Sequence, residues 1–459
     1  MHKSKLPQIK FLVTSSSDLY GGGSIAAYRI HRALIEGGYI STMVVNRKLS
    51  NDNSVIELNG FIKRIYKKCI SGGINFPFSY RFGKMLKSCF EKFYSILKQS
   101  GREIFFFPAS HKILSKINYK PDYIFLSNIQ SNYFDIRLIN NWSLNHKIFY
   151  SLQDLWIFTG HCGVPVDCER FKFGCGECPD LNLPPAIVKD ETKKNHLVKN
   201  SLLIKNPLHF IAPSNWVYNQ INNIKLHPDS TISLIPNAID TSIFSPGSRS
   251  ESRKKLNLCT DAIIVATSAV GFRFNPYKDI DTLFKAFDKL QNQKIINKNV
   301  CLVVIGDKKD NFPYIQDEQI IFTDTLNCQE DIVNYYRSAD IFVHSSNIET
   351  WGYTVSEALS VGIPVIASNV GGIKDQIRSY NYHKGKYSKA VPNEFNLTDA
   401  NGILFERGDA DGLLSALEHL IENEKIRFII GKNARNYALN QLDIKFQLIK
   451  FIEKCNELY

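Results

Sequence analysis

Two glutamates, Glu349 and Glu357, lie eight residues apart in a polar stretch that follows the apolar segment 339–344. Carboxylates accept hydrogen bonds from sugar and ribose hydroxyls, and the N-terminus of a helix favours phosphate. This pair therefore suits a nucleotide-activated sugar. The alternative is that both glutamates lie on a solvated helix face and complement the helix dipole. Motifs elsewhere in the sequence are needed to choose between the two interpretations.

The residues around the pair predict a strand, a polar loop, a short helix and a second strand across residues 341–367. Glu349 is expected on the loop at the carboxyl end of the first strand, and Glu357 about one turn into the helix. Gly362 and Pro364 are expected to end that helix. Because open parallel sheets bind ligands at the carboxyl ends of their strands, both carboxylates are expected at a ligand crevice.

Two cations, Arg273 and Lys278, follow another expected strand at 262–267. At the carboxyl edge of a sheet they could neutralise a diphosphate leaving group without a metal. The alternative is a pair of exposed surface cations ahead of a helix.

The glycines Gly21, Gly22 and Gly23 follow the first expected strand and open a helix. Glycines at that position let the backbone approach a phosphate or a sugar closely. Their spacing differs from the dinucleotide-binding pattern, and a tight turn alone would need the same residues.

The whole chain alternates strand and helix patterns in two halves. Strands are expected at 9–14, 40–45, 123–126, 147–152, 210–212 and 232–235 in the first half, and at 262–267, 301–305, 320–322, 341–344, 365–367 and 402–405 in the second. Closing helices are expected at 410–422 and 444–458. The pattern predicts an α/β protein with two doubly wound Rossmann-like domains facing a cleft, and a hinge at 236–240.

The composition is that of an ordinary globular protein, with 459 residues, 44% of them apolar and 22% charged. The apolar run 9–13 is too short for the core of a signal peptide, and the sequence has no run long enough to span a membrane. We therefore expect the chain in the cytoplasm.

The formal charge of +12 is concentrated in residues 61–120, which hold 13 Lys or Arg residues and two acids, Glu91 and Glu103. Many aromatic residues are interleaved with these cations. Such a segment suits an anionic membrane surface, although nucleic acid would attract the same charge. A helical insertion with a basic outer side is the structural alternative.

Together these motifs resemble the retaining family 4 glycosyltransferases, which have the two-domain GT-B fold. The Gly-Gly loop, Arg273 with Lys278, and the glutamate pair occur in that order in the family. The resemblance also covers residues 235–246, 338–343 and 362–372. It implies an acceptor-binding domain at 1–240, a nucleotide-sugar-binding domain at 241–440, and a final helix at 441–459 that packs back on the first domain.

A subset that builds polysaccharides, including O-antigen and colanic-acid-type transferases, carries stretches like 154–162 and 168–179. Members usually have His-Asp where this chain has Gln153-Asp154. The family's histidine contacts the donor sugar, so this departure falls on a catalytic position. Gln153 could keep the backbone carbonyl and one side-chain hydrogen bond.

Four cysteines, Cys162, Cys168, Cys175 and Cys178, lie within 17 residues of a loop at about 159–180. In a reducing compartment their clustering favours a structural zinc site over disulfides, with packed thiols as the third interpretation. His161 is either an alternative ligand, a group that contacts the acceptor, or a structural histidine.

The resemblance assigns a role to each candidate residue. Glu349 would hold the transferred sugar and Glu357 the ribose, while backbone amides near Gly352, Tyr353 and Thr354 would meet the pyrophosphate. Arg273 and Lys278 would stabilise the leaving group, so no catalytic metal is expected. Gly22, Gly23 and Asp154 belong to the domain that would present the acceptor. The two glycines would also contact the donor, and Asp154, with Gln153, is a candidate catalytic residue.

The implied partners are a UDP- or GDP-linked sugar, a lipid-linked glycan acceptor and the cytosolic face of an anionic membrane, with no nucleic acid. A nucleotide-sugar epimerase or phosphorylase on the same fold is one rival interpretation. A zinc- and RNA-binding protein built on the cysteines and the basic segment is the other.

Overall fold

The structure is a computed structural model that describes residues 9–58, 88, 99–103, 105, 107–130, 133–292, 298–326, 328–380 and 394–458. The chain forms two compact units. The first comprises residues 1–212, 217–234 and 454–459, and the second comprises residues 213–216 and 235–453. Most of the expected basic insertion at 61–120 lies outside the described residues.

The described part of the first unit contains a parallel sheet of seven strands in the order β3-β2-β1-β4-β5-β6-β7. The strands are β1 (Lys10–Ser17), β2 (Ile40–Arg47), β3 (Val55–Glu57), β4 (Tyr123–Ser127), β5 (Lys147–Ser151), β6 (His209–Ala212) and β7 (Thr231–Leu234). The helices are α1 (Gly22–Glu36), α4 (Leu138–Trp142), α5 (Thr192–Lys205) and α6 (Asn215–Ile221).

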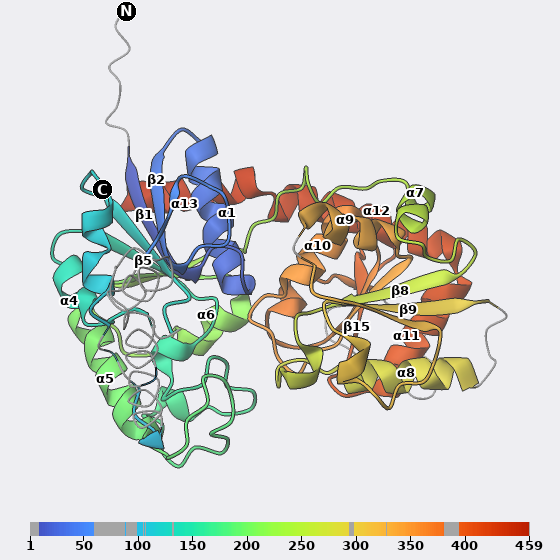
Figure 1. Cartoon of the computed structure of the whole chain (residues 1–459), viewed down its shortest axis with the longest axis horizontal. Helices are drawn as coiled ribbons and strands as arrows, with labels where there is room; N and C mark the ends of the chain where they lie inside the picture. Colours follow the sequence, from blue (N-terminus) through green and yellow to red (C-terminus); the bar gives the residue numbers. More distant parts are fainter. Residues whose placement is uncertain are drawn as a thin grey trace, which may run out of the picture. The chain divides into compact units, whose positions relative to one another are not determined.

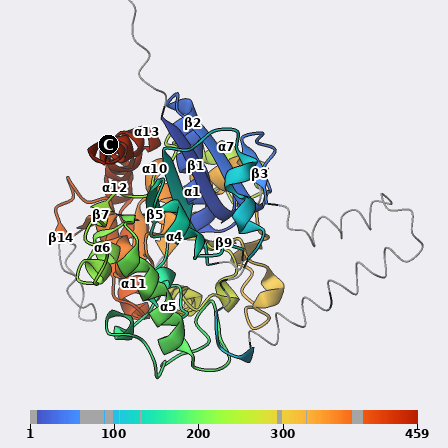
Figure 2. The same ribbon diagram turned by 90° about the vertical axis from the view of Figure 1, so that its left-hand side faces the viewer.

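Helix α1 packs against β1 and β2 (Figure 2). Its buried face is built largely from small residues, among them Ala26, Ala27 and Ala33. Small side chains let the helix lie close to the sheet, and the buried strands beneath it supply the larger apolar groups. This packing fixes the helix that starts at the glycine loop.

The described part of the second unit contains a parallel sheet of eight strands in the order β10-β9-β8-β11-β12-β15-β13-β14. The strands are β8 (Ile263–Ser268), β9 (Val300–Ile305), β10 (Ile320–Thr323), β11 (Ile341–His344), β12 (Val365–Ser368), β13 (Ser379–Tyr380), β14 (Glu394–Phe395) and β15 (Gly402–Phe405). The helices are α7 (Arg249–Lys255), α8 (Ile280–Asn292), α9 (Gln329–Ser338), α10 (Tyr353–Val361), α11 (Ala410–Glu422), α12 (Glu424–Tyr437) and α13 (Ile444–Glu457).

Helices cover both faces of this second sheet (Figure 1). Helices α8 and α11 share one face, where Leu283, Phe287 and Leu417 pack with the strand residues Val304 and Val343 in one apolar core. Helices α9, α10 and α12 lie over the other face. Strand β9 is buried along its whole length, which explains its unbroken apolar sequence.

The structure confirms the predicted fold class, and each expected strand is present with bounds that differ by at most three residues. The short strands β3, β13 and β14 and the helix α12 were not expected. The final helix returns to the first unit as predicted, because Cys455 is buried there and its carbonyl accepts a hydrogen bond of 2.7 Å from the Tyr123 hydroxyl. Among the described helices, none has both the length and the apolarity that crossing a membrane requires.

In each sheet the strand order reverses direction beside the first strand of the unit, and in the second sheet β15 also returns to lie between β12 and β13. In the first unit the chain builds β1, β2 and β3 outward and then returns to place β4 on the other side of β1. The second unit repeats this with β8, β9 and β10 before β11 pairs with β8. Ligands of doubly wound sheets bind at such reversal points, so ligand-binding residues are expected on the loops after β1, β4, β8 and β11.

Candidate active site

The segment from the end of β11 through α10 carries both predicted glutamates. Glu349 lies on the loop and Glu357 is the fifth residue of α10, as the sequence predicts. Gly362 ends the helix in the left-handed conformation, with φ of 85°. The Tyr336 hydroxyl donates a 3.0 Å hydrogen bond to Oε2 of Glu357, which fixes this carboxylate against α9.

The structure brings Lys278 directly to Glu349. The Lys278 Nζ contacts Oε1 of Glu349, and only 13% of the lysine side chain and 17% of the glutamate side chain are exposed. A backbone bridge between Lys278 and Ser346 joins the loops that carry them. Burial alone would raise the pKa of Glu349, but the charge of Lys278 and the hydrogen bond from His344 outweigh it and lower that pKa to about 2. The carboxylate is therefore ionised at neutral pH.

His344, the last residue of β11, was not among the predicted site residues. It is 2% exposed, and its Nε2 lies 3.4 Å from Oε1 of Glu349. Burial and the nearby charge of Lys278 lower the pKa of His344, so its imidazole is neutral at neutral pH. In the sequence this histidine is simply the last residue of an apolar strand, so its contact with Glu349 could not be predicted from the pattern.

Glycines bring the backbone of neighbouring loops onto the glutamate loop. The Gly372 amide donates a 2.9 Å hydrogen bond to the Glu349 carbonyl. A Cβ at Gly371 would lie 1.9 Å from that carbonyl oxygen, and one at Gly372 would lie 2.2 Å from the Thr350 oxygen. Gly352, with φ of 91°, occupies the N-cap of α10 and offers no side chain to cap the first amides of the helix. The helix N-terminus can therefore bind an anion.

Arg273 does not join this cluster. Its side chain is exposed, and the guanidinium lies over the Tyr314 ring at 5.5 Å from the centroid. Its backbone amide donates to Asp307 at 3.4 Å. The loop after β8 thus places Lys278 in contact with Glu349, whereas Arg273 lies exposed on the same loop.

In the first unit, the glycine loop lies against two residues from other strand ends. A Cβ at Gly23 would come within 3.1 Å of the Gln153 Cβ and 3.4 Å of the Asn128 Cβ. Asn128 has a positive φ of 50°, and its amide donates to Ser16 and Ser24 at 2.6 and 3.0 Å. Sequence reasoning missed Asn128, although a polar residue directly after an apolar strand marks the ligand edge of a sheet.

Asp154 is held on the same edge by neutral donors. The Trp156 amide donates to it at 2.9 Å, and the Gln130 amide donates at 2.5 Å. Gln130 in turn donates to Asn128 at 2.6 Å, so one amide chain joins the ends of β4 and β5. Burial raises the pKa of Asp154 to about 6, against the Trp156 hydrogen bond and the charge of Lys199.

A buried ion pair supports the loop after Asp154. Lys199 of α5 is 0% exposed, and its Nζ lies 2.6 Å from Oε2 of Glu103 and 4.2 Å from the centroid of the Trp156 ring. The Trp156 indole N–H also donates to Glu103. The contacts of Lys199 and Glu103 with Trp156 thus fix the loop that carries Gln153 and Asp154.

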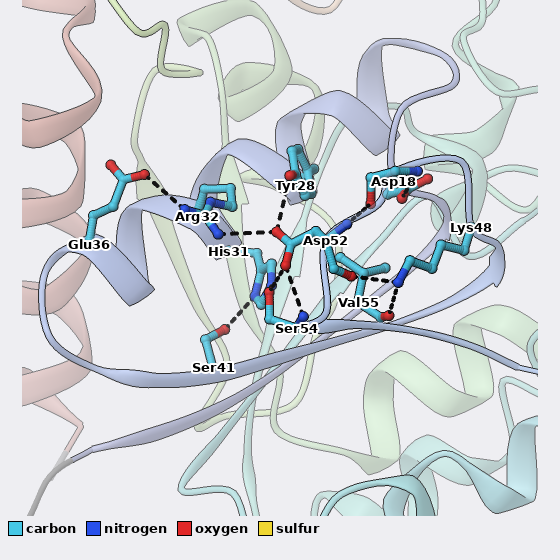
Figure 3. Close-up of polar contacts among 11 residues, drawn as sticks. Asp18, Tyr28, His31, Arg32, Glu36, Ser41, Lys48, Asp52, Ser54 and Val55 are labelled. Carbon is cyan, nitrogen blue, oxygen red and sulfur yellow. Dashed lines mark hydrogen bonds and ion pairs between the residues drawn. The ribbon is translucent and has the colours of Figure 1, made fainter.

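A second polar cluster fixes the loop after β2 against α1 (Figure 3). Asp18, at the end of β1, accepts hydrogen bonds of 3.0, 2.8 and 2.9 Å from the amides of Leu19, Leu49 and Ser50. Asp52 accepts from Tyr28 and Arg32 of α1, each at 3.1 Å. These carboxylates hold the loop after β2 against the end of β1 and against α1.

His31 completes that cluster. Its two ring nitrogens lie 2.8 Å from the Ser41 hydroxyl and 2.9 Å from the Ser54 hydroxyl. Burial lowers the pKa of His31 to about 4, so the imidazole is neutral at neutral pH. This histidine joins α1 to strand β2 and to the loop between β2 and β3.

The four cysteines occupy one irregular loop of the first unit, and all four are free thiols. The Gly160 amide donates to Cys175 Sγ at 3.2 Å, and His161 Nε2 lies 3.3 Å from Cys178 Sγ. His161 is 1% exposed, and its other nitrogen lies 3.0 Å from the Pro185 carbonyl oxygen, which fits the structural alternative for this residue. Within the described ranges, no three His, Cys, Asp or Glu groups stand in an arrangement that could hold a metal ion. Zinc stays a prediction.

Comparison with known proteins now identifies the chain. The family of glycosyl transferases group 1 matches residues 248–437, the part of the second unit that holds the Lys278–Glu349 pair. A protein that carries the name colanic acid biosynthesis glycosyl transferase WcaC in Escherichia coli strain K12 is 21% identical over 370 residues, which are 78% of this chain and 82% of the relative.

The chain is a glycosyltransferase.

A second relative is the UDP-Gal:α-D-GlcNAc-diphosphoundecaprenol α-1,3-galactosyltransferase of Escherichia coli. It is 27% identical over 235 residues, which span 50% of this chain and 54% of the relative. Among solved structures, Anabaena Alr3699/HepE in complex with UDP and glucose superposes with a TM-score of 0.63 at 15% identity, over 98% of this chain and 100% of that one. The glycosyltransferase therefore has the GT-B fold.

The predicted site residues of this glycosyltransferase fall into two groups, one in each unit. In the second, Lys278, Glu349 and Thr354 are linked through contacts at Glu349 and His344, and Glu357 follows on the same helix as Thr354. In the first, Gly23, Gln153 and Asp154 are neighbours through Asn128 and Gln130. Each group lies at the strand-order reversal of its own sheet.

Proposed function

We propose that this glycosyltransferase moves a sugar from a nucleotide-sugar donor to a lipid-linked glycan, with retention of the anomeric configuration. The observation that carries the proposal is the contact between Lys278 and Glu349 beside the N-terminus of α10. It places a cation, a carboxylate and a set of helix amides at one strand-order reversal. A nucleotide sugar needs these three kinds of group for its diphosphate and its hydroxyls.

In this proposal the two ends of the donor meet different residues. The amides at Gly352, Tyr353 and Thr354 bind the pyrophosphate, and Lys278 neutralises the charge that develops as the nucleoside diphosphate leaves. Glu349 accepts hydrogen bonds from the sugar hydroxyls, while Glu357 accepts them from the ribose. Arg273 adds a second cation when its side chain leaves the Tyr314 ring.

Retention follows from the same arrangement if the acceptor attacks from the face on which the phosphate leaves. The departing phosphate then takes the acceptor proton, so the site needs no separate general base and no catalytic metal. On this proposal Gly22, Gly23 and Asp154 of the first unit bind the acceptor, and Gln153 takes the place of the family's histidine.

The comparisons support the substrate classes. HepE was solved with UDP and glucose, and the name of the second relative specifies a UDP-linked donor and a diphosphoundecaprenol acceptor. A lipid-linked acceptor would place the enzyme at the cytosolic face of a membrane. The charge of residues 61–120, with 13 basic and two acidic residues, would favour binding to anionic lipid.

A donor panel tests the proposal. Thermal unfolding is measured with UDP, GDP and ADP and with their common sugar conjugates, because the correct donor stabilises the folded state. The selected labelled donor is then incubated with a lipid-linked acceptor extract, using wild type and Glu349→Gln. Transfer by wild type and its loss in the variant support the proposal, and wild-type turnover by the variant would refute the role of Glu349.

The membrane part has its own test. Flotation with anionic liposomes compares wild type with a variant in which Lys63, Arg64, Lys67 and Lys68 are replaced by Ala. These residues lie outside the described ranges, so the test rests on charge alone. Unchanged flotation would remove this cluster from the proposal.

A further inference from the structure

His344 contacts residues on both sides of the loop that holds Glu349. Its Nε2 lies 3.0 Å from the Ser346 hydroxyl and 3.4 Å from Oε1 of Glu349. Its Nδ1 lies 3.1 Å from the hydroxyl of Thr354, the second residue of α10. One buried ring therefore spans from the glutamate to the start of the helix.

The partners decide which nitrogen carries the proton. An ionised carboxylate can only accept, so a lone pair of Nε2 facing Glu349 would be repelled. The proton therefore sits on Nε2, where Ser346 and Glu349 share it. Nδ1 is left as an acceptor for the Thr354 hydroxyl proton. Each contact of the ring then has a donor and an acceptor.

Lys278 and His344 hold the same oxygen of Glu349. Both contacts run to Oε1, and Oε2 lies on the other side of the carboxylate. When the donor's phosphates draw Lys278 toward themselves, the bond from His344 still fixes the carboxylate. Oε2 is then the oxygen presented to a sugar hydroxyl.

We propose that His344 is a positioning residue that couples the sugar-binding end of the donor site at Glu349 to the phosphate-binding end at Thr354 and the N-terminus of α10. This inference rests on the proposed function, since it assigns the two ends to one nucleotide sugar. It adds a residue that acts through Glu349 and Thr354 without touching the substrate. Its consequence is that phosphate binding at the helix and sugar binding at the glutamate depend on each other.

Three substitutions separate the two contacts of the ring. His344→Gln places an amide near the Nε2 position and keeps the donor to Glu349. His344→Asn reaches only the Nδ1 position and keeps the contact to Thr354. His344→Leu fills the space and removes both. If the leucine variant does not fold, the two amide variants still carry the test.

Coupling is measured as a double-mutant cycle on the affinity for the donor. Glu349→Gln and Thr354→Val are made singly and together, in the wild-type background and with His344→Leu. The probes are UDP-glucose and UDP, or GDP-mannose and GDP if the donor panel selects guanine. We expect the two effects to depart from additivity by about fivefold or more when His344 is present, and to become additive in the leucine background.

The affinities of the single variants for the nucleotide sugar and for the bare nucleotide should separate the two contacts of the ring. His344→Gln should keep the affinity gained from the sugar over the bare nucleotide, whereas His344→Asn should lose it and bind the nucleotide as before. A purely structural role would lower the affinities for both probes equally. Coupling that persists without His344, or additivity in wild type, would overturn the inference.

The free enzyme separates failure of this inference from failure of the proposed function. In ¹⁵N-histidine-labelled protein at pH 7.5, with no nucleotide present, the imidazole signal lost in the His344 variants should report a proton on Nε2 and an unprotonated Nδ1. A proton on Nδ1 would overturn the bonding pattern whatever the enzyme binds. A protein with the expected signal that binds no nucleotide sugar would instead refute the proposed function, and with it the coupling.

Discussion

The ammonium of Lys278 contacts the carboxylate of Glu349 across 71 residues of sequence, and both side chains are largely shielded from water. Removing one partner leaves the other charge buried without compensation, which costs more than removing the pair. The contact therefore makes a proposed donor-binding feature contribute to the stability of the second unit.

The pair yields the first prediction. Lys278→Met and Glu349→Gln should each lower the free energy of unfolding by about 2–4 kcal/mol. The double variant should cost clearly less than the sum of the two. Urea denaturation of the four proteins measures this, and strict additivity would show that the contact is not formed in solution. Lys289→Met, which breaks a pair with Asp411 on the exposed surface, serves as a control with a small effect.

Asp154 gives a prediction on pH. Its pKa is raised to about 6 in the folded protein, against about 3.9 in the unfolded chain. The folded state therefore binds more protons between these values, and this group's contribution to stability falls as the pH rises from about 4 to about 6. Relative to Asp154→Asn, wild type should lose about 2–3 kcal/mol across this window.

Urea unfolding at pH 4.5, 5.5 and 7 tests this against Asp229→Asn, a carboxylate in the same unit that is 82% exposed. The difference between wild type and Asp154→Asn should change with pH by more than any change seen for Asp229→Asn. Parallel curves for all three proteins would contradict a raised pKa at Asp154.

His31 gives the opposite dependence. Its pKa is lowered to about 4, against about 6.5 in an unfolded chain. Here the unfolded state binds more protons, so stability is full above about pH 6.5 and is lost as the pH falls toward 4. We expect wild type to lose up to about 3 kcal/mol over this range, and His31→Gln to lose less. His227→Gln, on a partly exposed loop, serves as the comparison variant in the same denaturation series.

The glutamate pair and Lys278 could be predicted from the sequence because both follow apolar strands. In parallel sheets the carboxyl ends of strands meet at one edge, so polar residues at those ends become neighbours whatever their separation in the chain. The position of Glu357 on a helix ended by Gly362 followed from local signals as well.

The residues that support the site could not be found in this way. His344 ends an apolar strand, and its role depends on the path of a loop that returns over it. Lys199 and Glu103 form their pair across 96 residues, from segments whose packing no periodic pattern records. Arg273 is the opposite case, a residue that was predicted for the site but does not join it. It follows the same strand as Lys278, but the turn at Gly271 leaves its side chain exposed over Tyr314.

Zinc binding by the cysteine loop remains a prediction that can be tested directly. Thiolates of Cys162, Cys168, Cys175 and Cys178 could fix an irregular loop through a zinc ion if the loop draws them together. We expect about one zinc per chain after purification without chelator, and its loss in Cys175→Ser/Cys178→Ser. Cys259→Ser, at an exposed thiol, is the control. Elemental analysis without zinc would leave packed thiols as the interpretation.

Substitution of Gly371 tests whether the close approach of its backbone to the loop that carries Glu349 matters for binding. It has φ of 45°, and a Cβ would lie 1.9 Å from the Glu349 carbonyl oxygen. Gly408 also has a positive φ, of 74°, but a Cβ there would meet nothing within 4 Å. Gly408→Ala should therefore cost only the left-handed strain, about 1 kcal/mol, with unchanged donor affinity.

Gly371→Ala must bear a similar strain and also displace the backbone of Glu349, so the carboxylate moves away from Lys278. We expect donor affinity to fall by at least about tenfold, because the proposed contacts to the sugar and to the leaving group would be misplaced. Calorimetric titration with the selected nucleotide sugar, alongside the bare nucleotide, measures the effect. Equal donor affinity in the two alanine variants would show that the glutamate loop does not depend on this contact.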